Sequence, residues 1–269
     1  MARAWGLCRV ARAWGLCRVA LLWDHCPERC RRSPEAVARI AFVCAMPMEL
    51  RPLAKLLALR KEGAEGETFH TGTLGTHSVF AKVTGMGPKL AGQNALSLIE
   101  ATTPDHLVVF GIAGALDEET RIGHVVQPEL VVDASTGAER RPMHLGDRPP
   151  AGKMWTTDEV ITDLEVLHEL RRRQVVALEM ETAAIAEICD KREIPWSVFR
   201  AISDHATSAM LDSAVFSLLN ADGTTNWPSV ARFAVRHPRR IPRVTRFAVD
   251  ANLAARKAAE AAVAACEKL

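Results

Sequence analysis

The chain has 269 residues, of which 48% are hydrophobic and 25% charged, which is enough for one large α/β domain. Its formal net charge of +2 gives no overall argument for an anionic partner, so we expect no membrane partner and disfavour nucleic acid. The seven cysteines are odd in number and scattered, which excludes a secreted disulfide framework and indicates a cytoplasmic location. No second Cys/His pair follows His25, Cys26 and Cys30, so we expect no metal site.

The first 37 residues differ from the rest of the chain. Residues 2–10 and 11–19 are the same nine-residue sequence, ARAWGLCRV, which is too short a unit for a solenoid module. We interpret residues 1–37 as a non-globular or artefactual extension, with an Arg-rich transit-type presequence as the alternative. Residues 38–269 are then expected to form a single α/β domain.

Short apolar runs alternate with helical patterns along this second part. The predicted strands are 40–45, 68–73, 78–84, 107–110, 130–132, 175–178 and 196–202. The predicted helices are 47–57, 85–101, 163–173, 181–191 and 249–268. The alternation predicts a mixed central β-sheet flanked by helices, in a three-layer sandwich.

Glycines or carboxylates follow most of these strands. They occupy residues 46–49, 85–87, 111–114, 179–181 and 203–204. Ligands of such folds gather beyond the carboxyl ends of the strands, so we expect these residues to line one pocket. Glycine turns let backbone N–H groups approach a ligand, and acids can transfer protons and accept hydrogen bonds from hydroxyl groups.

Six segments together resemble the nucleoside phosphorylase and nucleosidase superfamily, most closely its 5'-methylthioadenosine/S-adenosylhomocysteine nucleosidases. They are CAMPMEL (44–50), TGMGPKLAG (84–92), FGIAGAL (110–116), IGHVV (122–126), ALEMETAAIA (177–186) and FRAISDHA (199–206). The resemblance covers residues 40 to about 206. It implies the three-layer fold, a small-molecule nucleoside substrate, a homodimer and no organic or metal cofactor.

The resemblance also implies roles for individual acids. Asp204 would protonate N7 of the purine as the glycosidic bond breaks, because adenine leaves poorly until its ring is protonated. Ser203 would help to hold the Asp204 carboxyl, and Glu49 would activate the attacking water.

Further residues are expected to bind the substrate. Glu181 would accept hydrogen bonds from the ribose hydroxyls, Met180 would pack on the sugar, and Glu179 would support them with a hydrogen bond. The other expected contacts are Met46, Gly87, Ala113, Gly114 and, for the base, Val160 and Ile161.

Two alternatives to a nucleosidase stay open. The first is a phosphate-dependent phosphorylase, although Glu49 stands where such an enzyme needs to attract phosphate. The second is a nucleoside-binding protein without turnover, because the segment over 127–177 is shorter than the resemblance leads us to expect. The arginines of residues 232–246 are either a solvated face or a contact to an anionic partner.

Overall fold

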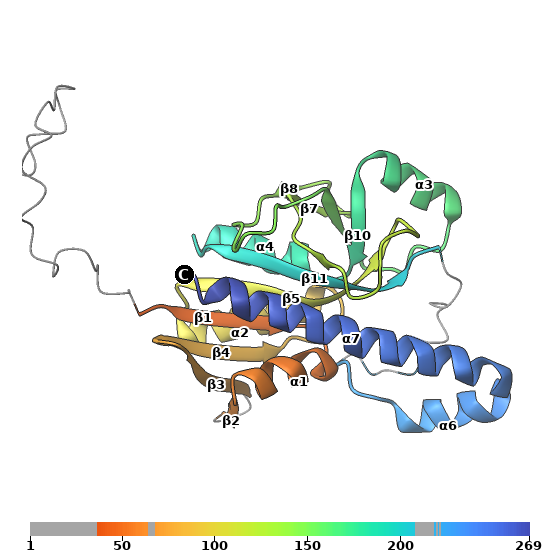
Figure 1. The fold of residues 1–269 in the computed structure, drawn as a ribbon, viewed down its shortest axis with the longest axis horizontal. Helices are drawn as coiled ribbons and strands as arrows, with labels where there is room; N and C mark the ends of the chain where they lie inside the picture. Colours follow the sequence, from red (N-terminus) through yellow and green to blue (C-terminus); the bar gives the residue numbers. More distant parts are fainter. Residues whose placement is uncertain (1–36, 64–67, 208–217, 219, 221) are drawn as a thin grey trace, which may run out of the picture. The chain divides into compact units, whose positions relative to one another are not determined.

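A mixed sheet of eleven strands forms the middle layer of the described part of the chain (Figure 1). The structure is a computed structural model that describes residues 37–63, 68–207, 218, 220 and 222–269. Val37–Leu269 form one unit, and the nine-residue repeat and His25, Cys26 and Cys30 lie outside the described residues.

The strands follow the order β2-β3-β4-β1-β5-β10-β9-β7-β8, and β11 pairs with both β5 and β6. Their bounds are β1 Arg39–Cys44, β2 Arg60–Glu62, β3 Phe69–Leu74, β4 His77–Val83, β5 His106–Ala115, β6 Val125–Val126, β7 Leu130–Asp133, β8 Glu139–Arg140, β9 Lys153–Thr156, β10 Val175–Glu179 and β11 Trp196–His205. β1 runs parallel to β4 and β5, β11 runs parallel to β5, and β10 runs antiparallel to β5.

Helices cover both faces of this sheet. They are α1 Pro47–Leu56, α2 Pro88–Thr102, α3 Leu164–Arg172, α4 Thr182–Lys191, α6 Trp227–Arg236, the short 3-10 helix η2 Pro238–Arg240 and α7 Ile241–Cys266. Side chains alternate along β1, so Ala41 and Val43 pack with α2 and α4, whereas Ile40 and Phe42 pack with α1 and α7. The mixed sheet between two helical layers confirms the predicted fold class.

The strand β5 changes partner along one of its edges. β11 pairs with it over residues 107–115, which occupies one edge along almost its whole length. The opposite edge is therefore shared by β1, which pairs with residues 106–109, and β10, which pairs with residues 114–115. Between them, residues 110–113 pair with none of the described strands on that edge, and we call this gap the fork.

Several element boundaries differ from those predicted. The sequence from Gly111 to Gly114 continues β5 instead of turning, because β11 pairs with it up to Ala115. Ser203 and Asp204 also lie inside a strand, β11, rather than after one.

The helical predictions need two corrections. α7 begins at Ile241, eight residues before the predicted start, and α6 was not predicted at all. Both misses fall in a segment whose arginines interrupt the apolar pattern. Among the described residues, no helix combines the length and apolar character needed to cross a bilayer.

Candidate active site

Arg200 of β11 lies at the centre of a buried group of acids. Its Nη2 donates to Oε2 of Glu179 at 2.6 Å and to Oε2 of Glu181 at 3.3 Å. Its Nη1 lies 3.9 Å from Oε1 of Glu49. All four side chains are at most 7% exposed. Burial lowers the pKa of Arg200, but the three carboxylates more than offset this and the net pKa is raised.

Glu49 closes the fork in the sheet. Its Oε1 accepts a hydrogen bond of 2.8 Å from the backbone N–H of Ile112, and Nη1 of Arg200 donates to the Ile112 carbonyl at 3.3 Å. The two side chains thus satisfy the peptide groups that lack a strand partner there. Oε2 of Glu49 accepts from the backbone N–H of Met46, which precedes α1, so the acid also caps that helix. Burial raises the pKa of Glu49, and Arg200 opposes this.

The close approach of these side chains requires glycine at position 111. Gly111 has φ +151°, and a Cβ there would lie 2.4 Å from Oε1 of Glu49 and 2.7 Å from Nη1 of Arg200. Both distances are below 3.0 Å, a separation that real Cβ atoms essentially never show. The residue is therefore needed for the acid–arginine pair and not for a turn.

Both carboxylate oxygens of Glu179 accept hydrogen bonds from other groups of the protein. Its Oε2 accepts from the backbone N–H groups of Glu181 and Thr182 at 3.0 and 2.8 Å and from the Thr182 hydroxyl at 2.7 Å. The Thr156 hydroxyl donates to its Oε1. These bonds, with that from Arg200, leave Glu179 little capacity to bind a ligand.

Glu181 stands at the beginning of α4. Its Oε1 accepts a hydrogen bond of 3.0 Å from the backbone N–H of Gly87. Burial raises the pKa of Glu181 to about 7, with Arg200 lowering it and Glu179 raising it further. Met180 beside it is half-buried.

Asp204 holds one oxygen without a partner. Its Oδ1 accepts from the Ser203 hydroxyl at 2.5 Å, and that hydroxyl also lies 3.3 Å from the carbonyl oxygen of Ala113. Its Oδ2 is buried and has no hydrogen-bond partner in the described structure. Burial raises the pKa of Asp204, while the bond from Ser203 lowers it. Gly114 lies opposite, where a Cβ would be 3.3 Å from Oδ2.

Arg200 and Asp204 lie on the same strand, β11, which pairs with β5. Arg200 is opposite Gly111 and Asp204 is opposite Gly114. Asp204 lies four positions after Arg200 along the strand, a distance of about 13 Å. Buried carboxyl groups therefore flank the carboxyl-terminal half of β5, with the Arg200 group at one end and Asp204 at the other.

A family model described as the phosphorylase superfamily matches residues 39–150 and 134–236, which together make up most of the chain. The chain belongs to the phosphorylase superfamily. The segments that hold Glu49, Glu181 and Asp204 all fall within the matched residues.

Several curated proteins are similar to this chain. The 5'-methylthioadenosine/S-adenosylhomocysteine nucleosidase of Tolumonas auensis is 26% identical over 199 residues, covering 62% of this chain and 86% of the relative. The protein of the same name from Mycobacterium tuberculosis is 28% identical over 221 residues, with the same coverage.

Solved structures share the fold. The nucleosidase of that name from Neisseria meningitidis, in complex with methylthio-immucillin-A, has a TM-score of 0.66 and 19% identity, and the match covers 87% of this chain and 100% of the other. The futalosine hydrolase of Helicobacter pylori has a TM-score of 0.64 and 18% identity, covering 87% of this chain and 99% of the other.

The two predicted base contacts lie away from the acids' hydrogen-bond network. Val160 lies in the loop between β9 and α3 and is 37% exposed. Ile161 packs against the small apolar cluster that contains Leu116, and Ala206 packs against the same cluster. Ile161 therefore shares this cluster with Ala206, two residues after Asp204, whereas Val160 is not part of it.

A cavity of about 340 Å³ opens beyond the carboxyl-terminal ends of β5 and β11. Its lining includes Leu116 and Thr207, which directly follow the β5–β11 pairing, together with His168 and Arg171 of α3. None of the three buried acids lines it, so it is not the space around Arg200.

Sequence reasoning missed Arg200 and Thr156 in this phosphorylase-superfamily member. Arg200 interrupts an otherwise apolar strand, and a cation there supplies the countercharge that buried Glu179 and Glu181 require. An arginine within an apolar strand could therefore have been recognised in the sequence as a partner of buried acids. Thr156 gave no comparable signal, because a single threonine at a strand end has many ordinary uses.

Proposed function

We propose that the chain is a purine nucleosidase that hydrolyses the N-glycosidic bond of a 5'-modified adenosine, of the methylthioadenosine or adenosylhomocysteine type, and releases adenine. The observation that carries the proposal is Asp204, a buried carboxyl whose pKa is raised by burial and whose Oδ2 has no partner within the described structure. The names of the similar curated proteins support this substrate class.

In the proposed reaction, Asp204 acts as the general acid. Its raised pKa favours the protonated form, and its Oδ2 gives the proton to N7 of the purine. The bond between N9 and the anomeric carbon then breaks, and its electron pair moves into the protonated base. Ser203 positions the carboxyl through its bond to Oδ1.

Glu49 acts as the general base in this proposal. Burial raises its pKa, so it accepts a proton more readily than an exposed glutamate. It takes one proton from water as the water oxygen bonds to the anomeric carbon. The hydrogen bonds to its two oxygens from Met46 and Ile112 hold it in one orientation.

Glu181 accepts hydrogen bonds from the ribose hydroxyls, with Met180 against the sugar. The acids exceed the single guanidinium of Arg200 in number, so the site has an excess of negative charge when they are ionised. That excess favours an oxocarbenium-like transition state, in which the sugar becomes positive. Gly87, Ala113, Gly114, Val160 and Ile161 complete the proposed set of substrate contacts.

Hydrolysis is favoured over phosphorolysis by the charges. A phosphate at the position of the attacking water would meet Glu49 and Glu181, and Arg200 is already engaged by three carboxylates. A homodimer belongs to the same proposal, which sedimentation velocity on the purified chain tests.

The test is adenine release from methylthioadenosine, adenosylhomocysteine, 5'-deoxyadenosine and adenosine, each with and without phosphate. We expect release from 5'-modified substrates that does not depend on phosphate. Release only with phosphate would establish the phosphorylase instead. Adenine binding without turnover of any substrate would establish the non-catalytic alternative.

A further inference from the structure

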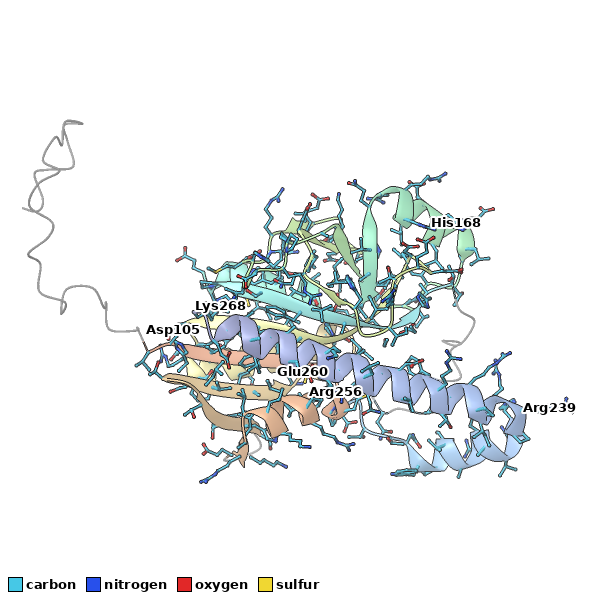
Figure 2. The ribbon with its side chains drawn as sticks, viewed as in Figure 1. Asp105, His168, Arg239, Arg256, Glu260 and Lys268 are labelled. Carbon is cyan, nitrogen blue, oxygen red and sulfur yellow. The ribbon has the colours of Figure 1, made fainter. Side chains whose placement is uncertain are left out.

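The helical hairpin of α6, η2 and the start of α7 is strongly basic. Residues 223–249 contain six arginines and neither lysine nor acid. These are Arg232, Arg236, Arg239, Arg240, Arg243 and Arg246. Figure 2 shows Arg239 at the turn between α6 and α7. We call residues 227–249 the basic hairpin.

The same hairpin exposes large apolar side chains. Trp227 is 72% exposed, Val235 83%, Ile241 41% and Val249 63%. Elsewhere in the described residues, most side chains of this size are buried in the three apolar clusters. Four such side chains within 23 residues are too many to be scattered surface exceptions.

On α6 the exposed residues form one stripe. Trp227, Ala231 and Val235 are spaced four residues apart, which places them along one side of the helix, and all three are exposed. Arg232 and Arg236 directly follow Ala231 and Val235 and are exposed as well. Val230, Phe233 and Ala234 of α6 are half-buried, so packing within the fold accounts for that side of the helix. It does not account for the exposed side chains of Trp227 and Val235.

Part of the charge of the basic hairpin has no countercharge within the described part of the chain. Arg246 lies 3.8 Å from Asp250, an exposed pair of little strength. Across the described residues, no carboxylate lies within ion-pair distance of Arg232, Arg236 or Arg243. A partner with a dense negative charge would therefore gain from these cations without breaking existing pairs.

We propose that the basic hairpin docks on an anionic membrane surface, lying in the headgroup region with Trp227 and Val235 inserted. An amphipathic helix with tryptophan on its exposed apolar side and arginines further round its circumference suits this boundary, because the indole ring favours the interface and the guanidinium groups meet lipid phosphates. The contact is peripheral, since the described residues hold no helix suited to crossing a bilayer.

Other occupants fit the hairpin less well. A symmetric contact with a second copy would place the arginines of one hairpin against those of the other. Residues 1–36 contain seven arginines and three acids, so they have the same sign of charge. Nucleic acid would meet the cations but would leave Val235, Ile241 and Val249 exposed to water.

The net charge of the whole chain does not reflect this feature, although the arginines of residues 232–246 had already left a contact to an anionic partner open. The excess of acids elsewhere cancels the six arginines in the total, so the expectation of no membrane partner rested on an average.

The experiment is co-sedimentation of the full chain with vesicles of phosphatidylcholine, with and without about one third phosphatidylglycerol. The test variant replaces Arg232, Arg236 and Arg243 by Gln. The control variant replaces Arg60, Arg148 and Arg172, which are exposed and outside the hairpin, and so removes the same charge. Circular dichroism verifies that both variants fold.

We expect the parent and the control to bind the anionic vesicles and the test variant to bind about 100-fold more weakly. Trp227→Ala is expected to weaken binding without changing its salt dependence. Equal binding by the test and control variants would overturn the proposal and point to residues 1–36. Failure of the parent to bind, or binding of an oligonucleotide but not of vesicles, would overturn it as well.

Discussion

Nη2 of Arg200 lies 2.6 Å from Oε2 of Glu179, and both side chains are almost completely buried. Replacing Arg200 by Met would leave Glu179 and Glu181 buried without a cation. We expect a loss of about 3 to 5 kcal/mol in the free energy of unfolding at pH 7. Urea denaturation measures it. Arg172→Met is the control, because its partner Glu169 is exposed, and a similar loss there would contradict the argument.

Gly111→Ala is expected to lower the free energy of unfolding by about 3 kcal/mol or more, since the added methyl group meets Glu49 and Arg200. Gly137→Ala is the matched control. Gly137 also has a positive φ, +73°, but a Cβ there has nothing within 4 Å. Its cost is only the backbone strain, about 1 kcal/mol. Thermal or urea unfolding distinguishes the two, and equal losses would contradict the crowding at the fork.

Glu181 makes the stability depend on pH. Burial raises its pKa from 4.5 to about 7, so the folded chain keeps a proton that the unfolded chain has lost. Its contribution to stability is therefore present below pH 4.5 and is lost as pH rises to about 7. The stability of Glu181→Gln minus that of the parent should rise over this window by on the order of 3 kcal/mol.

The stability of the parent is subtracted because His106 changes the stability with pH in the opposite direction. Burial lowers the pKa of His106 to about 4, so its contribution to stability is lost as pH falls from 6.5 to about 4. It is present in both proteins and cancels in the difference. A flat difference between pH 4.5 and 7 would show that Glu181 is not desolvated.

Asp204→Asn should reduce adenine release by about 10² to 10⁴-fold, because an amide cannot give the proton. Adenine binding, followed by equilibrium dialysis, should change far less. Asp147→Asn is the control, since that side chain is 88% exposed and lies at the surface. An Asp204→Asn variant with half of the parent activity would exclude Asp204 as the acid.

Ser203→Ala should move the alkaline side of the pH–rate profile. Activity is expected to fall with rising pH as Asp204 loses its proton, and with falling pH as Glu49 gains one. The Ser203 hydroxyl lowers the pKa of Asp204, so its removal raises that pKa and shifts the alkaline limb to higher pH. Ser135→Ala, in an exposed turn, should leave the profile unchanged. A shift to lower pH would contradict the assigned hydrogen bond.

The sequence was most informative where burial follows a simple period. The apolar run over residues 40–45 predicted β1, and the Ala-rich run from Glu181 predicted α4, because both are buried by the neighbouring layers. The fork could not be predicted, since an apolar pattern shows that a strand is buried but not where its partner changes. For the same reason the sequence suggested a turn at Gly111, although a glycine there leaves room for the side chains of Glu49 and Arg200.

The acids of the site were easier to locate than to explain. Glu49, Glu181 and Asp204 were found from their positions near predicted strand ends. The electrostatic reason for Glu179 lies in Arg200, which is 21 residues away in the chain and meets it only when β10 and β11 are folded.

Glu49 and Arg200 satisfy the peptide of Ile112 where the sheet divides, so they are needed for folding as well as for any chemistry. A related protein that had lost catalysis would still be under selection to keep Glu49 and Arg200. Their presence in a related chain is therefore poor proof of an active enzyme. Asp204, whose Oδ2 makes no structural bond in the described chain, is free to drift once catalysis is lost, and so is the better marker of a working member.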